Sequence, residues 1–98
     1  MSFYKKKRTW LEARDIHACL KAQKRCGVSI SSSDIEFIVR VIQNCCTIKQ
    51  KKLTNDSTLH SLYYKGNLIH VIYDKKYKNI RTFLSDKMAN DEYISDSF

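Results

Sequence analysis

The sequence lacks the features that mark several classes of protein. Only two of its 98 residues are glycine and 43% are hydrophobic, which excludes a disordered tail and favours a folded domain. No run of about 18 apolar residues occurs, so we expect no membrane span. The positively charged start, MSFYKKKRTW, is not followed by an apolar segment, so we expect no secretory signal. The length predicts a single domain over residues 1–98, with a basic lead-in (1–9), a core (10–85) and an acidic tail (86–98).

The four cysteines form neither a metal-binding pattern nor a readable disulfide framework. Cys19 and Cys26 are seven positions apart and Cys45 and Cys46 are adjacent, so no Cys-x-x-Cys pair is present. Half of a zinc site can be drawn from His17 and Cys19, but small buried thiols are the favoured interpretation. We therefore expect no metal, no cofactor and a reducing, cytoplasmic location.

The net charge of +8 is unevenly distributed along the chain. Residues 1–26 carry eight Lys or Arg against two acids, and residues 49–81 again carry eight against two. Residues 86–98 sum to −3. Two basic segments of this kind predict a polyanion, such as RNA, as partner, and the alternative is a basic surface that serves solubility alone.

Residues 10–25, WLEARDIHACLKAQKR, are predicted to form a helix with two distinct faces. Gly27 is suited to the left-handed conformation that ends such a helix. A histidine among four cations is either part of a solvated face or part of a phosphate-binding site. The expected core face consists of Ala13, Ile16 and Leu20, with Cys19 and Gln23 beside them, and the opposite face consists of Trp10, Arg14, His17, Lys21, Lys24 and Arg25.

A second helix is predicted to begin at a capping box. Ser33 is the expected N-cap and Glu36 the expected reciprocal partner three residues later. Apolar residues then recur at three- and four-residue spacing as far as Cys46, and the helix is expected to end near Asn44. This helix is expected to supply core rather than chemistry.

Three extended segments follow, over residues 58–64, 68–73 and 80–84, with a possible short strand at the start of residues 47–56. Their connections are short, so we expect an antiparallel meander. The fold class is therefore α+β, with two N-terminal helices packed on one face of a three- to four-stranded antiparallel sheet. Residues 86–98 form either a short helix or a tail.

Strict alternation places Ile80, Thr82 and Leu84 on one side of the last strand and Arg81, Phe83 and Ser85 on the other.

Several short motifs of the chain resemble those of a known group of proteins. The resemblance lies in His17-Ala18, Arg25, Gly27-Val28-Ser29, Asp34-Ile35-Glu36 and Tyr64-Lys65-Gly66-Asn67, followed by an apolar strand and a basic final strand. Over residues 14–85 this looks like the small bacterial RelE- and BrnT-type toxin domains. They belong to a superfamily of metal-independent ribonucleases that includes barnase, the EndoU nucleases and colicin D.

The resemblance implies a cleft where the first helix meets the sheet. His17 would match the helix histidine and Arg25 the arginine before the glycine turn, while Arg81, Thr82 and Ser85 lie on the strand that provides the remaining groups. Imidazole titrates near neutrality and suits a general base, and cations stabilise the charge that develops on a phosphoryl group. Arg14, Lys21 and Lys24 are the further candidates for binding RNA, and His60 and His70 are rival acid–base candidates.

Three functions remain open from the sequence. The preferred one is a toxin that acts as a metal-free endoribonuclease on tRNA or other cellular RNA, with an acidic antitoxin or immunity protein as its partner. The second is a nucleic-acid-binding module without catalysis. The third is an interaction protein, for instance an inhibitor, that captures an acidic partner.

Overall fold

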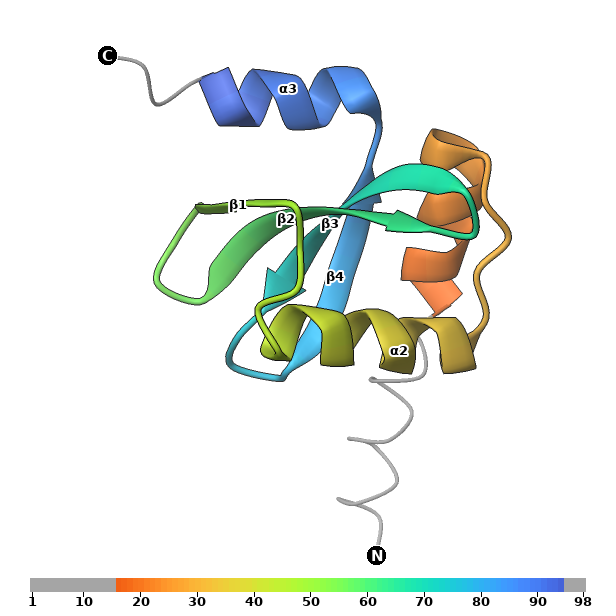
Figure 1. The fold of residues 1–98 in the computed structure, drawn as a ribbon, viewed down its shortest axis with the longest axis horizontal. Helices are drawn as coiled ribbons and strands as arrows, with labels where there is room; N and C mark the ends of the chain where they lie inside the picture. The colour runs from red at the N-terminus through yellow and green to blue at the C-terminus, as the bar shows by residue number, and fades with distance from the viewer. Residues whose placement is uncertain (1–15, 95–98) are drawn as a thin grey trace, which may run out of the picture.

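The computed structural model describes residues 16–94 and confirms the α+β class. A first helix over residues 16–26 is followed by α2 (Ser32–Gln43), β1 (Lys49–Lys52), β2 (Ser57–Tyr64), β3 (Asn67–Asp74), β4 (Asn79–Leu84) and α3 (Asp86–Ile94) (Figure 1). The four strands form one antiparallel sheet in the order β1-β2-β3-β4. The predicted meander is therefore correct, and the possible fourth strand is β1. No helix within residues 16–94 has both the length and the apolar character that a membrane crossing requires.

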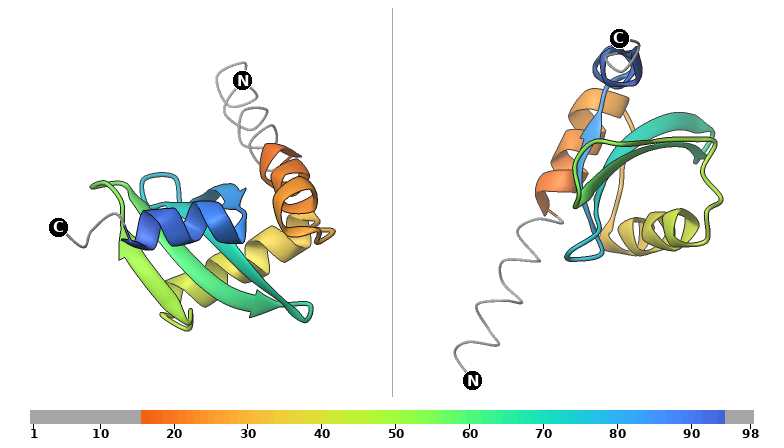
Figure 2. Two further views of the ribbon diagram at one scale, coloured as in Figure 1. Left: turned by 90° about the horizontal axis from the view of Figure 1, so that it is seen from above. Right: turned by 90° about the vertical axis from the view of Figure 1, so that its left-hand side faces the viewer.

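Helices cover both faces of this sheet. Helix α2 lies under one face and α3 lies over the other, while the first helix runs alongside the β4 edge (Figures 1 and 2). On the α2 side, Leu62, Val71 and Phe83 join one buried cluster. On the α3 side, Leu59 and Leu84 pack with Ala89 in a second, smaller cluster. The acidic end of the chain thus forms a helix that adds a third layer to the two that the sequence predicted.

The capping box of α2 lies two residues earlier than predicted. The N-cap is Ser31, whose hydroxyl accepts from the backbone N–H of Asp34, while Asp34 Oδ2 accepts from the backbone N–H of Ser31 at 2.8 Å. The expected pair, Ser33 and Glu36, is wrong. Both pairs have the spacing of a capping box, and contacts to a distant turn select the earlier one. The C-terminal end is as predicted, because Asn44 is the C-cap.

Asp34 also ties the start of α2 to the turn between β2 and β3. Its carboxylate accepts from the Tyr64 hydroxyl and pairs with Lys65 Nζ at 3.1 Å. The hydrogen bond from Tyr64, helped by those from Ser31 and Lys65, holds the pKa of Asp34 well below its usual range. The same carboxylate raises the pKa of Tyr64 to about 12. Several of the residues that carry the family resemblance therefore form a structural junction.

The first helix packs through small residues rather than through its large apolar ones. Ala18 and Ala22 are fully buried, whereas Ile16 and Leu20 are 62% and 65% exposed. The predicted core face is therefore wrong for these two residues, and Ala13 lies outside the described residues. Ala18, Ala22 and Cys26 recur every four residues, so they form one stripe that allows the helix to approach the sheet closely.

A register shift in β4 changes the predicted sorting of its side chains. Tyr73 pairs with Ile80 whereas Ile72 pairs with Thr82, so β4 has one additional residue at this point. Ile80 and Phe83 consequently both join the α2-side cluster, and Leu84 joins the α3-side cluster. The prediction that Ile80 shares a side with Leu84 is wrong, because strict alternation does not hold across a bulge.

Candidate functional site

The predicted site residues of the first helix do not converge on one cleft. His17 is exposed, Lys21 is half-buried and Lys24 is exposed, while Arg14 lies outside the described residues. Arg25 is half-buried, and its Nη1 donates to the backbone carbonyl of Phe83 at 3.0 Å. Its guanidinium is therefore directed at the edge strand of the sheet.

The last turn of the first helix secures the β4 edge. The thiol of Cys26 donates to the carbonyl of Leu84 at 3.3 Å, next to the carbonyl that receives the Arg25 guanidinium. Burial raises the pKa of the Cys26 thiol, so this thiol remains protonated and able to donate at neutral pH. These two side chains therefore join the end of the first helix to the backbone of two consecutive residues of β4.

The candidate site residues in β4, Arg81 and Thr82, and Ser85 just after it, also have structural partners. Arg81 Nη2 pairs at 3.1 Å with Asp74, a carboxylate with 2% side-chain exposure that also accepts from the backbone N–H groups of Lys76 and Tyr77. Thr82 Oγ1 lies 3.5 Å from the carbonyl of Phe83. Ser85 accepts from the backbone N–H of Met88 at 3.3 Å and so caps the start of α3.

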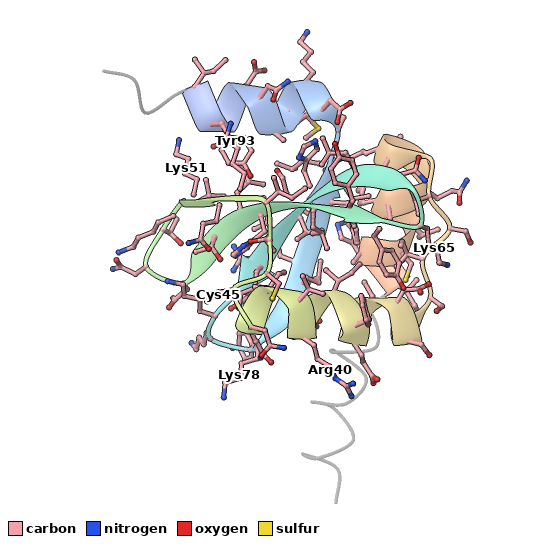
Figure 3. All side chains as sticks on the ribbon, viewed as in Figure 1. Arg40, Cys45, Lys51, Lys65, Lys78 and Tyr93 are labelled. Carbon is pink, nitrogen blue, oxygen red and sulfur yellow. The ribbon has the colours of Figure 1, made fainter. Side chains whose placement is uncertain are left out.

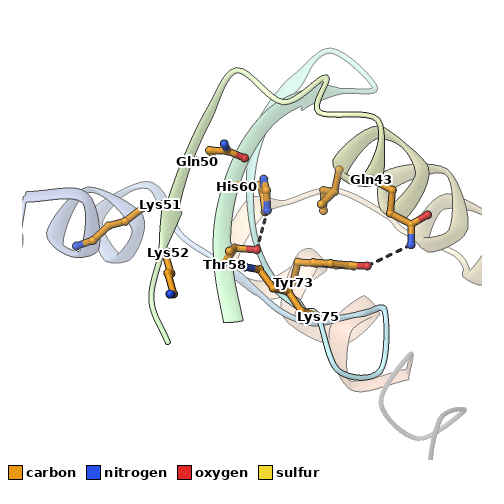
Figure 4. A pocket seen from close by; sticks show the side chains of 9 residues that line it. Gln43, Gln50, Lys51, Lys52, Thr58, His60, Tyr73 and Lys75 are labelled. Carbon is orange, nitrogen blue, oxygen red and sulfur yellow. Dashed lines mark hydrogen bonds between the residues drawn. The ribbon is translucent and has the colours of Figure 1, made fainter. Parts of the chain in front are cut away.

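A pocket of about 420 Å³ lies instead between the C-terminal end of α2 and one end of strands β1, β2 and β3 (Figure 4). We call it the His60 pocket. It lies on the α2 side of the sheet, away from His17, Arg25 and Arg81, none of which lines it. Its lining residues are Ile42, Gln43, Gln50, Lys51, Lys52, Thr58, His60, Tyr73 and Lys75.

Strand register brings the polar groups of this pocket together. Gln50 pairs with His60 across β1 and β2, and Lys52 pairs with Thr58. Thr58 in turn pairs with Tyr73 across β2 and β3. Directly opposed residues of an antiparallel sheet point to the same face, so these five side chains converge on the α2 side of the sheet.

His60 is 4% exposed and lies at the base of the pocket. Thr58 Oγ1 is 2.8 Å from its Nε2, and Thr47 Oγ1 is 3.2 Å from its Nδ1. Burial, together with the positive charge of Lys75, lowers the pKa of His60 from the ordinary value of 6.5. The imidazole is therefore neutral at neutral pH, and one of its two nitrogens can accept a proton.

Cations and amides line the same pocket as this neutral imidazole. Within residues 16–94, no carboxylate lies within ion-pair distance of Lys52 or Lys75. Lys51 points away from the pocket, and its ammonium donates to the backbone carbonyl of Glu92 in α3 (Figure 4). Gln43 Nε2 donates to the Tyr73 hydroxyl at 3.2 Å. The pocket therefore presents positive charge and hydrogen-bonding groups, a combination that suits a phosphate ester.

Sequence reasoning identified His60 as a candidate but missed most of its surroundings. The sequence does not predict Gln43, Gln50, Lys52, Tyr73 or Lys75 as site residues. The register of β1 with β2 would have revealed Gln50 and Lys52, but the sequence indicates β1 only as a possible short strand. His70, the other rival candidate, lies on the α3 side of the sheet, where it bonds to Ser61 and Asp86.

Comparisons with known proteins add no relationship. No protein family model matches the chain, and neither a curated protein nor a solved structure matches it. Among the described residues, no group of three or more His, Cys, Asp or Glu side chains is placed to hold a metal ion.

Proposed function

We propose that the protein binds RNA in the His60 pocket and cleaves a phosphodiester bond there without a metal ion. The observation that carries this proposal is a neutral imidazole at the base of a pocket that Lys52 and Lys75 line. A neutral imidazole supplies a base, and the ammonium groups supply the positive charge that a phosphoryl transition state requires. The resemblance to metal-independent ribonuclease toxins supports the same reaction class.

Thr58 marks the position of the attacking group. Its hydroxyl lies 2.8 Å from His60 Nε2, which is the distance at which a 2′-hydroxyl of RNA would transfer a proton. When Nδ1 donates to Thr47, Nε2 is free to accept. A bound 2′-hydroxyl therefore replaces the Thr58 hydroxyl at Nε2 after a rotation of the Thr58 side chain.

The reaction forms one bond to phosphorus and breaks another. The 2′-oxygen attacks phosphorus and transfers its proton to His60, and the bond to the 5′-oxygen breaks. Lys52 and Lys75 stabilise the phosphoryl oxygens, and the Lys75 ammonium provides a proton for the leaving 5′-oxygen. The products are a 2′,3′-cyclic phosphate and a 5′-hydroxyl end. Gln50, opposite His60 on β1, is placed to hydrogen-bond a neighbouring base.

The test is incubation of the purified protein with total RNA in EDTA, followed by mapping of the new ends. We expect cuts that carry a 2′,3′-cyclic phosphate, a loss of cutting of about 100-fold or more in His60→Gln, and unchanged cutting in His17→Ala. The pKa of His60 is lowered from 6.5, so the imidazole stays neutral down to more acidic pH than a free histidine. On the acid side of the pH profile the rate should therefore begin to fall only below about pH 6.5. Loss of cutting in His17→Ala alone would instead place the reaction on the first helix.

A second candidate function is RNA binding without cleavage. It is favoured by the two threonine hydroxyls, one at each ring nitrogen, which already satisfy the hydrogen bonding of His60. In that case RNA would bind in a salt-dependent manner and remain intact, and His60→Gln would change the affinity little.

An acidic protein partner would bind to the same two lysines of the pocket. An antitoxin or immunity protein with a carboxylate-rich segment would neutralise Lys52 and Lys75 and exclude RNA from the pocket. A cytoplasmic location would place the protein beside tRNA and other cellular RNA, in agreement with four free cysteines.

A further inference from the structure

A chain of hydrogen bonds lies on the α3 side of the sheet, opposite the His60 pocket. Ser61 Oγ of β2 is 2.7 Å from His70 Nδ1 of β3, and His70 Nε2 is 2.7 Å from Asp86 Oδ1 at the start of α3. The Tyr93 hydroxyl of α3 is 2.7 Å from the same Ser61 oxygen. Ser61 and His70 are 4% and 5% exposed.

The carboxylate at one end of this chain sets the direction of its protons. An ionised Asp86 only accepts, so the proton of a neutral His70 lies on Nε2. His70 Nδ1 then carries a lone pair and accepts from the Ser61 hydroxyl. Ser61, His70 and Asp86 are therefore placed as nucleophile, base and orienting carboxylate.

A pocket of about 220 Å³ opens on this serine and histidine, between α3 and strands β1 to β3. One wall carries three large apolar side chains, Ile48, Tyr63 and Leu68, which are 60%, 68% and 40% exposed. Tyr63 and Leu68 are directly paired across β2 and β3, so they form a continuous apolar surface. Such a wall favours an apolar group next to the serine.

Donors lie on the opposite side of this pocket. Tyr93 extends from α3 towards the sheet (Figure 3), and Ser61 Oγ at 2.7 Å is nearer to its hydroxyl than the Lys49 carbonyl at 3.4 Å. Burial raises the pKa of Tyr93, so its hydroxyl is protonated at neutral pH. Lys49 Nζ lies 4.1 Å from the centre of the Tyr93 ring, and the Asn90 side chain also lines the pocket. Of these groups the Tyr93 hydroxyl lies next to the Ser61 oxygen, and Lys49 and Asn90 add further donors to the lining of the same pocket.

We propose that Ser61 is the nucleophile of a second site, which takes the acyl group of small carboxylic esters with an apolar acyl part. Ser61 Oγ bonds to the carbonyl carbon as its proton passes to His70 Nδ1. The ester bond then breaks, and the alcohol leaves with that proton. Water repeats the sequence on the acyl-serine, which releases the carboxylic acid and restores the Ser61 hydroxyl. This site is independent of RNA cleavage.

Covalent labelling with an alkyl fluorophosphonate, followed by intact-mass measurement and peptide mapping, tests the nucleophile. We expect a single adduct, on Ser61, and none in Ser61→Ala. His17→Ala, an exposed histidine of the first helix outside this pocket, is the control and should label at the wild-type rate. An absent adduct, or one confined to lysine or tyrosine side chains, would contradict the proposal.

Asp86→Asn tests the positioning of the histidine. The Asp86 side chain is 78% exposed, so the variant should fold, which circular dichroism and thermal melting will verify. An amide no longer fixes the proton on Nε2, so labelling should slow by at least about 10-fold while α3 stays docked. An unchanged labelling rate in the folded variant would show that the network is structural only.

Turnover of p-nitrophenyl butyrate tests the hydrolytic half of the reaction. Release of p-nitrophenolate should disappear in Ser61→Ala and persist in His17→Ala, whose exposed imidazole is the obvious source of background reaction. Equal release by the wild type and Ser61→Ala would overturn the proposed activity.

Discussion

Arg25 shows at the scale of a single residue how a candidate catalytic group can have a structural role. A basic side chain just before a glycine turn resembles a ribonuclease motif, yet its guanidinium donates to the Phe83 carbonyl at the sheet edge. A hydrogen bond from a charged donor to a carbonyl of the buried residue Phe83 stabilises the fold, and its loss leaves that carbonyl without the donor. His17 lies two turns earlier on the same helix and is exposed.

Replacement of Arg25 should therefore reduce stability rather than act only on catalysis. We expect Arg25→Ala to lower the free energy of unfolding by about 1.5–3 kcal/mol, as is typical for a hydrogen bond to a charged group. Urea denaturation followed by circular dichroism measures the change. His17→Ala is the control and should stay within about 0.5 kcal/mol of the wild type. Equal stability of the two variants would contradict the structural role of Arg25.

At the scale of the element, the start of α2 shows how a distant contact selects one of two local patterns. Ser31-Asp34 and Ser33-Glu36 both satisfy the spacing of a capping box, but only Asp34 meets Tyr64 and Lys65. The helix therefore begins where its cap is fixed by the β2–β3 turn. A sequence window of four residues contains no information about that turn.

The two serines provide a matched test of this start. Ser31→Ala removes the N-cap hydroxyl and should destabilise the protein by about 0.5–2 kcal/mol, whereas Ser33→Ala, inside the first turn, should have little effect. Chemical denaturation of both variants under the same conditions measures the difference. A larger loss in Ser33→Ala would restore the start predicted from the sequence.

The elements that the sequence predicts correctly are those defined by local patterns. Short turns and strand-forming residues fix β2, β3 and β4, and regular apolar spacing fixes α2. Hydrophobicity predicts the wrong core face for the first helix, because its packing depends on the small residues Ala18 and Ala22 rather than on the most hydrophobic ones. The sequence does not decide between a helix and a tail at α3, because the docking of this helix depends in part on polar contacts from Asp86 and Tyr93 to residues of β2 and β3.

The candidate site was harder to predict than the fold because it depends on strand register. His60 is visible in the sequence as a histidine in a strand, but Lys52 reaches its pocket only through the pairing of β1 with β2. A bulge in β4 likewise alters the positions of Arg81 and Thr82. Register and bulges arise from tertiary contacts, so a pattern along one segment does not determine them.

At the scale of the whole molecule, the net charge of +8 favours binding of a polyanion, and Lys52 and Lys75 add positive charge at the His60 pocket. Binding of single-stranded RNA should weaken steeply with salt, with a slope of log K against log [salt] of about −0.7 for each phosphate neutralised. The double variant Lys52→Ala/Lys75→Ala should make this slope shallower by about 1.4. Fluorescence anisotropy of a labelled oligonucleotide at several salt concentrations measures the slope. Lys87→Ala, on α3, is the control, and an equal change in that variant would show that the charge acts without the pocket.

The first helix shields the β4 side of the sheet, so further strands could add to the described part of the molecule only next to β1. That border consists of Lys49, Gln50, Lys51 and Lys52. If two molecules met there in antiparallel orientation with their Gln50 residues paired, Lys49 of each would oppose Lys51 of the other on the same face of the sheet, and the like charges would repel. The same lysine-rich strand that contributes to the His60 pocket thus discourages the sheet from propagating into fibrils and keeps neighbouring molecules apart at high concentration.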